Sequence, residues 1–230
     1  PEANLFVAEG LFSTITNANF DEDRMVELAR RAIDLRARLR ERWLAAAPDA
    51  AAVTRLSAAT RWTPEPLDAL NLAAKGIALQ IVNHGEHSTV NEDILSLREL
   101  LLYGLKGMAA YTDHAYVLGA HNDAILRFLQ EGLVAIGNDA LTTDDLVGLV
   151  MRCGEMGVQA MALLDAANTT AYGHPEPTQV NLGVREGPGI LVSGHDLRDL
   201  EELLEQTAGT GVNVYTHGEM LPANAYPALK

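Results

Sequence analysis

The chain has 230 residues, 48% of them hydrophobic, which is enough for one large folded domain or two small ones. Seventeen basic and 31 acidic residues give a net charge of −14, which argues against binding to nucleic acid or to an anionic membrane. No apolar run reaches the roughly 18 residues of a transmembrane helix, and no signal-peptide pattern opens the chain. We therefore expect no nucleic-acid partner and no membrane partner.

A single cysteine, Cys153, limits the chemistry of the chain. No internal disulfide can form, which favours a reducing, cytoplasmic location. One thiol cannot hold an iron–sulfur cluster by itself, because such clusters usually have about four cysteine ligands. Cys153 lies in a helical pattern among apolar neighbours, so we interpret it as a packed thiol rather than a nucleophile.

Residues 20–172 have the apolar spacing of one helix after another. The clearest helix is predicted over 21–45, where acidic residues fill the first turn and apolar side chains recur at three- and four-residue steps. Further helices are predicted from Pro64 to Val82, from a cap at Asn91, over 122–137 and from a cap at Thr143. Three glycines inside these patterns are interpreted as points of close helix packing: Gly107, Gly154 and Gly157. These helices predict an antiparallel helical bundle.

The pattern changes at residues 174–188, which are rich in glycine and proline and are interpreted as a linker. After it, "GILVSG" reads as a strand, "DLRDLEELLEQ" as an amphipathic helix and "VNVYT" as a second strand. This order predicts a β-α-β unit with parallel strands. The fold is thus expected to be mainly α: a helical bundle over 1–173, then the beginning of an α/β domain with a Rossmann-like parallel sheet over 189–230. Two strands do not form a stable sheet alone, so this part needs further sequence, another chain or unusual packing.

Two potential metal ligands follow these strands. His195 lies two residues after the first strand, and Glu219 lies three residues after the second. Open parallel sheets bind ligands beyond the carboxyl ends of their strands, and neighbouring strands are about 4.8 Å apart. We therefore expect both side chains to converge on one point, where an imidazole and a carboxylate suit a metal ion. Asp196 is expected to cap the following helix instead.

The same residues have other interpretations. Histidines and acids in strand–helix loops often only cap helices or face solvent. His217 could be the ligand in place of His195, or could hold the ligands in position. His84 and His87 of "HGEH" have a spacing that suits a helical metal pair, but the turn-like sequence favours a solvated loop. The two remaining central histidines are interpreted as helix-surface or cap residues: His114 and His121.

Several segments together resemble the hybrid-cluster protein family, also called prismane proteins or hydroxylamine reductases. They include "LFSTITNANFD", "NEDILSLRELLLYGLKGMAAYTDHA", "LLDAANTTAYGHPEPTQV", "SGHDL" and "YTHGEMLPA". The resemblance covers most of the chain and is densest from Asn91 onward. In that family the His of "SGHDL" and the Glu of "HGEM" bind an iron–sulfur–oxygen hybrid cluster. The resemblance therefore implies that His195 and Glu219 bind the metal cofactor and that His217 belongs to the pocket.

The resemblance also implies a function. The family reduces hydroxylamine to ammonia and, in many members, nitric oxide, which would give nitrous oxide. Its hybrid cluster lies where a helical domain meets α/β domains, and electrons enter through a second iron–sulfur cluster, expected here to be of the 4Fe-4S type. Glu219 and His217 would then be the catalytic groups that supply protons. The implied partners are a small nitrogen-oxide substrate and a redox protein such as an NADH-linked reductase.

The chain departs from the family in its cysteines, because the motifs that complete both clusters are absent. The simplest interpretation is a portion of a longer hydroxylamine or nitric oxide reductase, which by itself is inactive and binds no cluster. The alternative is a catalytically inert helical domain with a structural or interaction role.

Overall fold

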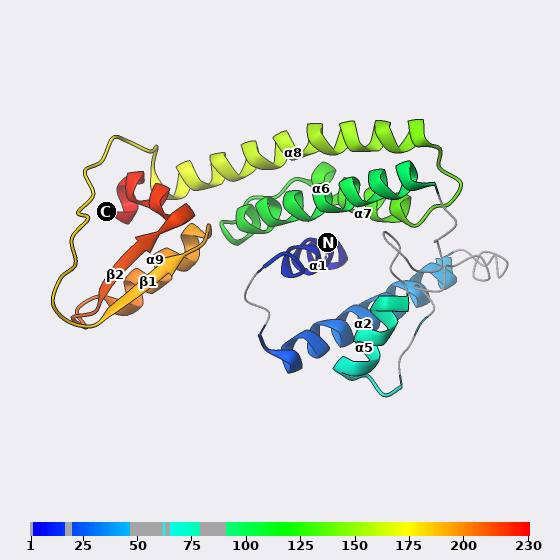
Figure 1. The fold of residues 1–230 in the computed structure, drawn as a ribbon, viewed down its shortest axis with the longest axis horizontal. Coiled ribbons are helices and arrows are strands. Elements are labelled where there is room, and N and C mark those ends of the chain that lie inside the picture. The colour runs from blue at the N-terminus through cyan, green and yellow to red at the C-terminus, as the bar shows by residue number, and fades with distance from the viewer. Residues whose placement is uncertain (1, 17–19, 47–61, 63–64, 79–90) are drawn as a thin grey trace. The chain divides into compact units, whose positions relative to one another are not determined.

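The structure is a computed structural model that describes residues 2–16, 20–46, 62, 65–78 and 91–230. It confirms a mainly α protein with a small parallel sheet (Figure 1). The helices are α1 (Glu2–Ser13), α2 (Glu22–Ala46), α5 (Ala69–Ala78), α6 (Glu92–Val117), α7 (Asp123–Ile136), α8 (Thr143–Tyr172) and α9 (Leu197–Thr207). The strands are β1 (Gly189–Ser193) and β2 (Asn213–His217), followed by the short 3₁₀ helices η1 (Gly218–Ala225) and η2 (Pro227–Leu229).

The helix boundaries follow the sequence with three differences. Helix α1 was not predicted, because its apolar residues spread around most of the helix and form no distinct helical stripe. Helix α5 begins at Ala69 rather than near Pro64, and residues 79–82 of the predicted helix lie outside the described residues. The cap of α8 is Thr142 rather than Thr143.

The start of α8 is a reciprocal capping box. The backbone N–H of Asp145 donates to Oγ1 of Thr142 over 3.3 Å, and the N–H of Thr142 donates to Oδ2 of Asp145 over 2.9 Å. The Thr142 hydroxyl also donates to the same carboxylate, and these bonds lower the pKa of Asp145. The cap therefore lies one residue earlier than predicted. At this position Thr142 and Asp145 satisfy each other's backbone N–H groups.

The chain forms two compact units, one of residues 1–110 and 126–157 and one of residues 111–125 and 158–230. The expected division into a bundle over 1–173, a linker and an α/β part from residue 189 stays a prediction. Within the first unit, α6 and α7 run antiparallel. Arg98, near the start of α6, binds the Asn138 carbonyl just after the end of α7, and Leu105, further along α6, packs against Gly132, which comes earlier in α7. The two helices therefore run in opposite directions and pack antiparallel, as the predicted bundle requires.

Arg98 joins α6 to the turn between α7 and α8. Its side chain is 1% exposed, and Nη2 donates to the Asn138 carbonyl and to Oδ1 of Asp139, both over 3.0 Å. Nε and Nη1 are buried without a hydrogen-bond partner among the described residues. Arg98→Met is expected to lower the free energy of unfolding by about 1–3 kcal/mol, because the Asn138 carbonyl loses its charged donor.

Denaturant unfolding of the chain measures this effect of Arg98. The matched control is Arg127→Met on α7, where the side chain is exposed and the expected change is within about 0.5 kcal/mol. Equal effects of the two substitutions would contradict a stabilising role for the buried guanidinium.

Helix α8 is, in the part of the chain that the structure describes, the one helix long and apolar enough to cross a membrane by length and composition alone. Its most apolar 18-residue window has a mean hydropathy of 1.3 and is 22% buried. Arg152 within α8 is paired with Glu131 over 3.4 Å and lies over the Phe128 ring, both on α7. The absence of a membrane partner stays a prediction.

In the second unit, α9 and η1 pack on the end of α8. The core residues are Tyr172, Leu197, Leu200, Met220 and Ala223, all less than 10% exposed. Helix α8 ends where Gly173 adopts a φ of +83° and its N–H donates to the Thr169 carbonyl over 3.0 Å. The two strands are parallel, as predicted, and pair from Gly189 with Asn213 to Ser193 with His217.

Tyr172 gives this core a pH dependence. Burial and the hydrogen bond that its hydroxyl donates to Glu201 over 3.1 Å raise the pKa of Tyr172. The folded chain therefore holds the phenol proton more tightly than the unfolded chain does. This stabilisation is complete below the ordinary tyrosine pKa of about 10 and is lost as the pH rises above it.

The expected result is a free energy of unfolding that falls with pH above about 10, and a smaller fall in Tyr172→Phe. Urea unfolding at a series of pH values measures both slopes. Tyr103→Phe is the control for the substitution itself, because Tyr103 is 60% exposed. A Tyr172→Phe slope identical to that of the unmodified chain would contradict the assignment.

Candidate functional site

The carboxyl ends of the two strands lie side by side. Ser193, the last residue of β1, pairs with His217, the last residue of β2. His195 and Glu219 therefore each lie two residues beyond a strand end. The predicted offset of three residues for Glu219 was wrong because β2 continues through His217, one residue further than its apolar run.

His195 and Glu219 come together as expected from the strand geometry. Nε2 of His195 is in direct contact with Oε2 of Glu219. The two side chains are 61% and 74% exposed, so the pair is open to solvent. An imidazole nitrogen and a carboxylate oxygen that meet in this way can turn to a shared cation. Their role as metal ligands stays a prediction.

His217 lies beside this pair in the sequence but has a different contact. Its Nδ1 is 3.4 Å from the hydroxyl oxygen of Ser193 on the neighbouring strand. The imidazole is exposed, and a bond at Nδ1 leaves Nε2 for another partner. This contact is compatible with His217 as a metal ligand and with His217 as a proton donor. Both roles stay predictions.

Asp196 is the cap of α9, as predicted. Its Oδ1 accepts from the N–H groups of Arg198 over 2.7 Å and Asp199 over 3.2 Å. The carboxylate is thereby committed to the first turn of the helix. The same cap fixes the loop that carries His195.

The other candidate residues lie apart from this pair in the sequence. His84 and His87 are outside the described residues. His114 lies half-buried in the last turn of α6, and His121 is exposed before α7. Cys153 is a packed thiol, as predicted: it is 6% exposed, and burial raises its pKa. Its sulfur lies 2.8 Å from the position that a Cβ on Gly104 would occupy, so α6 approaches α8 closely there.

The donor pair fits part of an iron site. Nitrogen and oxygen donors at one point suit iron, and their exposure leaves room for further ligands. The described residues contain no group of three or more histidine, cysteine, aspartate or glutamate side chains that could hold a metal ion. His195 and Glu219 can therefore supply two ligands, and the thiolates of an iron–sulfur cluster must come from elsewhere.

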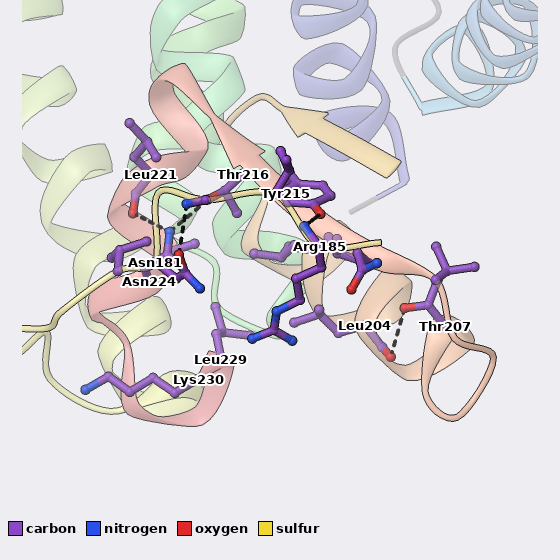
Figure 2. Close-up of a pocket in the computed structure, with 18 of the residues that line it drawn as sticks. Asn181, Arg185, Leu204, Thr207, Tyr215, Thr216, Leu221, Asn224, Leu229 and Lys230 are labelled. Atoms are coloured by element: carbon purple, nitrogen blue, oxygen red, sulfur yellow. Dashed lines mark hydrogen bonds between the residues drawn. The ribbon is translucent and has the colours of Figure 1, made fainter. Parts of the chain in front are cut away.

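A separate cavity of about 820 Å³ lies along β2 (Figure 2). It is lined by the segment 180–185, by β2 up to Thr216 and by η1, and its lining includes neither His195 nor Glu219. Arg185 extends across it, and its backbone N–H donates to the Tyr215 hydroxyl over 2.9 Å. Asn224 closes another side by donating to the Thr216 hydroxyl over 2.9 Å. Nothing in the sequence pattern indicated this cavity, since its walls come from the linker, β2, α9 and the 3₁₀ helices and share no motif.

Comparison with known proteins gives the family. A sequence profile of the Prismane/CO dehydrogenase family matches residues 2–230. Hydroxylamine reductases of Natranaerobius thermophilus and Halothermothrix orenii are 52% and 53% identical to the chain over 232 residues. That of Kosmotoga olearia is 55% identical over 234 residues. Each alignment covers 100% of this chain, which spans 40–41% of the length of these relatives. The chain belongs to the Prismane/CO dehydrogenase family.

Proposed function

We propose that this chain is part of an oxidoreductase that reduces hydroxylamine to ammonia. The observation that carries the proposal is the meeting of His195 and Glu219 at two strand ends. It gains support from the 52–55% identity to proteins named hydroxylamine reductase. The cofactor is an iron–sulfur–oxygen hybrid cluster held by His195, Glu219 and thiolates that this chain does not supply.

The proposed reaction breaks one N–O bond. Hydroxylamine takes up two electrons and two protons and yields ammonia and water. When bound, the cluster supplies the electrons and polarises the N–O bond. The chain supplies the donor pair and the protons: the carboxyl of Glu219 and the imidazole of His217 are the proposed proton carriers. The contact between Ser193 and Nδ1 of His217 orients that imidazole.

The finer assignments follow the family resemblance. We propose that nitric oxide is a second substrate, two molecules of which give nitrous oxide and water with two electrons and two protons. Electrons enter through a second cluster of the 4Fe-4S type from a redox protein, such as an NADH-linked reductase, in the cytoplasm. Two donors and one buried thiol do not complete a cluster, so the 230-residue chain alone is expected to be inactive.

Iron and acid-labile sulfide analysis of a full-length protein containing this sequence tests the function, together with hydroxylamine-dependent oxidation of a reduced viologen dye. The proposal predicts iron, sulfide and dye oxidation in the same preparation. A preparation that oxidises the dye without iron would contradict it, and so would an iron-loaded preparation that does not consume hydroxylamine. The second outcome would favour the inert structural role.

A further inference from the structure

Each member of the donor pair follows a glycine. Gly194 precedes His195 and has a φ of +144°, and Gly218 precedes Glu219 and has a φ of +56°. Both values lie in the region that L-residues rarely adopt. Throughout the described residues, every positive φ belongs to a glycine. Ser193 and His217 are the last paired residues of the two strands, so each glycine is the first residue after its strand and each donor is the second.

Lack of space does not explain these glycines. A Cβ on Gly194 would have nothing within 4 Å, and a Cβ on Gly218 would lie 3.5 Å from the Ser193 hydroxyl, an ordinary contact. The contrast is Gly189 at the start of β1, where a Cβ would lie 2.9 Å from the Tyr215 ring. At Gly194 and Gly218 the requirement is therefore for the backbone conformation itself.

We propose that Gly194 and Gly218 are positioning residues for the donor pair. A strand that continued past Ser193 or His217 would keep its side chains alternating between the faces of the sheet. A residue with a positive φ immediately after each strand breaks that alternation. It turns the backbone after both strands so that Nε2 of His195 meets Oε2 of Glu219. An L-residue with a branched side chain at position 218 is expected to leave the left-handed region and carry Glu219 away.

The inference uses the donor pair of the proposed function but concerns its geometry alone, so it can be tested without iron. The base chain for the test carries Cys153→Ala, His195→Cys and Glu219→Cys, which places one thiol on each loop. A short thiol crosslinker, dibromobimane, joins the two thiols only when both loops point to the same place. Intact mass and bimane fluorescence give the yield of the internal crosslink, which is expected to be high.

Three substitutions are then added to the base chain one at a time. Gly218→Val is expected to lower the crosslink yield about fivefold or more, because a β-branched residue resists a left-handed backbone. Gly218→Asn is expected to keep the yield, since asparagine tolerates a φ near +56°. The matched control is Gly209→Val in the turn before β2, where φ is +74° and the space is also open. It imposes the same backbone strain away from the donors and is expected to leave the yield unchanged.

Substitution of Gly194 is expected to change the crosslink yield in a different way from substitution of Gly218. Its φ of +144° lies outside the left-handed helical region, so Gly194→Asn is expected to lower the yield although Gly218→Asn does not. Circular dichroism confirms that each variant is folded, and Gly218→Ala replaces Gly218→Val if the valine variant unfolds. Equal yields in Gly218→Val and Gly209→Val would overturn the inference, as would a base chain that does not crosslink. An iron-free full-length protein would refute the proposed function while leaving this crosslinking result unchanged.

Discussion

Replacing His195 by alanine in a full-length protein containing this sequence is expected to strip iron from the hybrid cluster and to lower hydroxylamine reduction by about 100-fold or more. The reason is that the imidazole supplies the nitrogen donor of the pair that His195 forms with Glu219. Folding is expected to change little, because the side chain is 61% exposed and lies in a loop. Iron content, the visible absorption spectrum and the rate of dye oxidation measure the three effects.

Two further substitutions separate a ligand role from a general disturbance of the loop. Glu219→Gln keeps the shape of the side chain and removes the charge that stabilises oxidised iron, so it is expected to impair activity more than cluster assembly. Asp196→Ala removes the cap of α9, and it is expected to cost about 1 kcal/mol of stability while the cluster stays intact. Loss of the cluster in Asp196→Ala but not in His195→Ala would show that the ligand assignment is wrong.

Leu200→Ala is expected to lower the free energy of unfolding of the second unit by about 2–5 kcal/mol. Leu200 is 3% exposed and belongs to the same buried cluster as Leu197 and Met220. Leu197 lies two residues after His195, and Met220 directly follows Glu219. Because both residues are buried in this cluster, it anchors both donor loops. Removal of three buried carbon atoms leaves an empty volume within this cluster, in addition to the lost transfer free energy.

Thermal or denaturant unfolding measures the change in the free energy of unfolding that Leu200→Ala causes. Leu191→Ala on β1 is the matched control, because the same atoms are removed from a side chain that is 69% exposed. Its expected effect is within about 0.5 kcal/mol. A comparable loss of stability in both variants would mean that the cluster does not hold the donor loops in place.

The candidate site could be predicted because it rests on local rules. A strand, an amphipathic helix and a strand with short connections dictate parallel pairing, and parallel pairing puts both carboxyl ends at one edge. His195 and Glu219 meet for that reason, and Asp196 caps α9 because a carboxylate at that position satisfies the first backbone donors. The end of β2 was missed by one residue because pairing with Ser193, rather than hydrophobicity, decides where the strand stops.

Helix packing was harder to predict because it depends on which face meets a neighbour. The prediction that three glycines mark close helix contacts was wrong. Cβ atoms on Gly107, Gly154 and Gly157 would have nothing within 4 Å among the described residues. The close approaches are instead at Gly104, against Cys153, and at Gly132, where a Cβ would lie 2.7 Å from Leu105. A periodic sequence shows that a helix has an apolar face, but the residue that a partner approaches most closely is set by the crossing of the two helices.

The most direct test of the central claim, that His195 and Glu219 bind the iron of a hybrid cluster, is anomalous diffraction at the iron edge from crystals of the full-length protein. We expect an anomalous peak between Nε2 of His195 and a carboxylate oxygen of Glu219, with the contact between the two side chains replaced by bonds to the metal. Anomalous iron peaks located only elsewhere in the protein, with His195 and Glu219 still in contact with each other, would contradict the account.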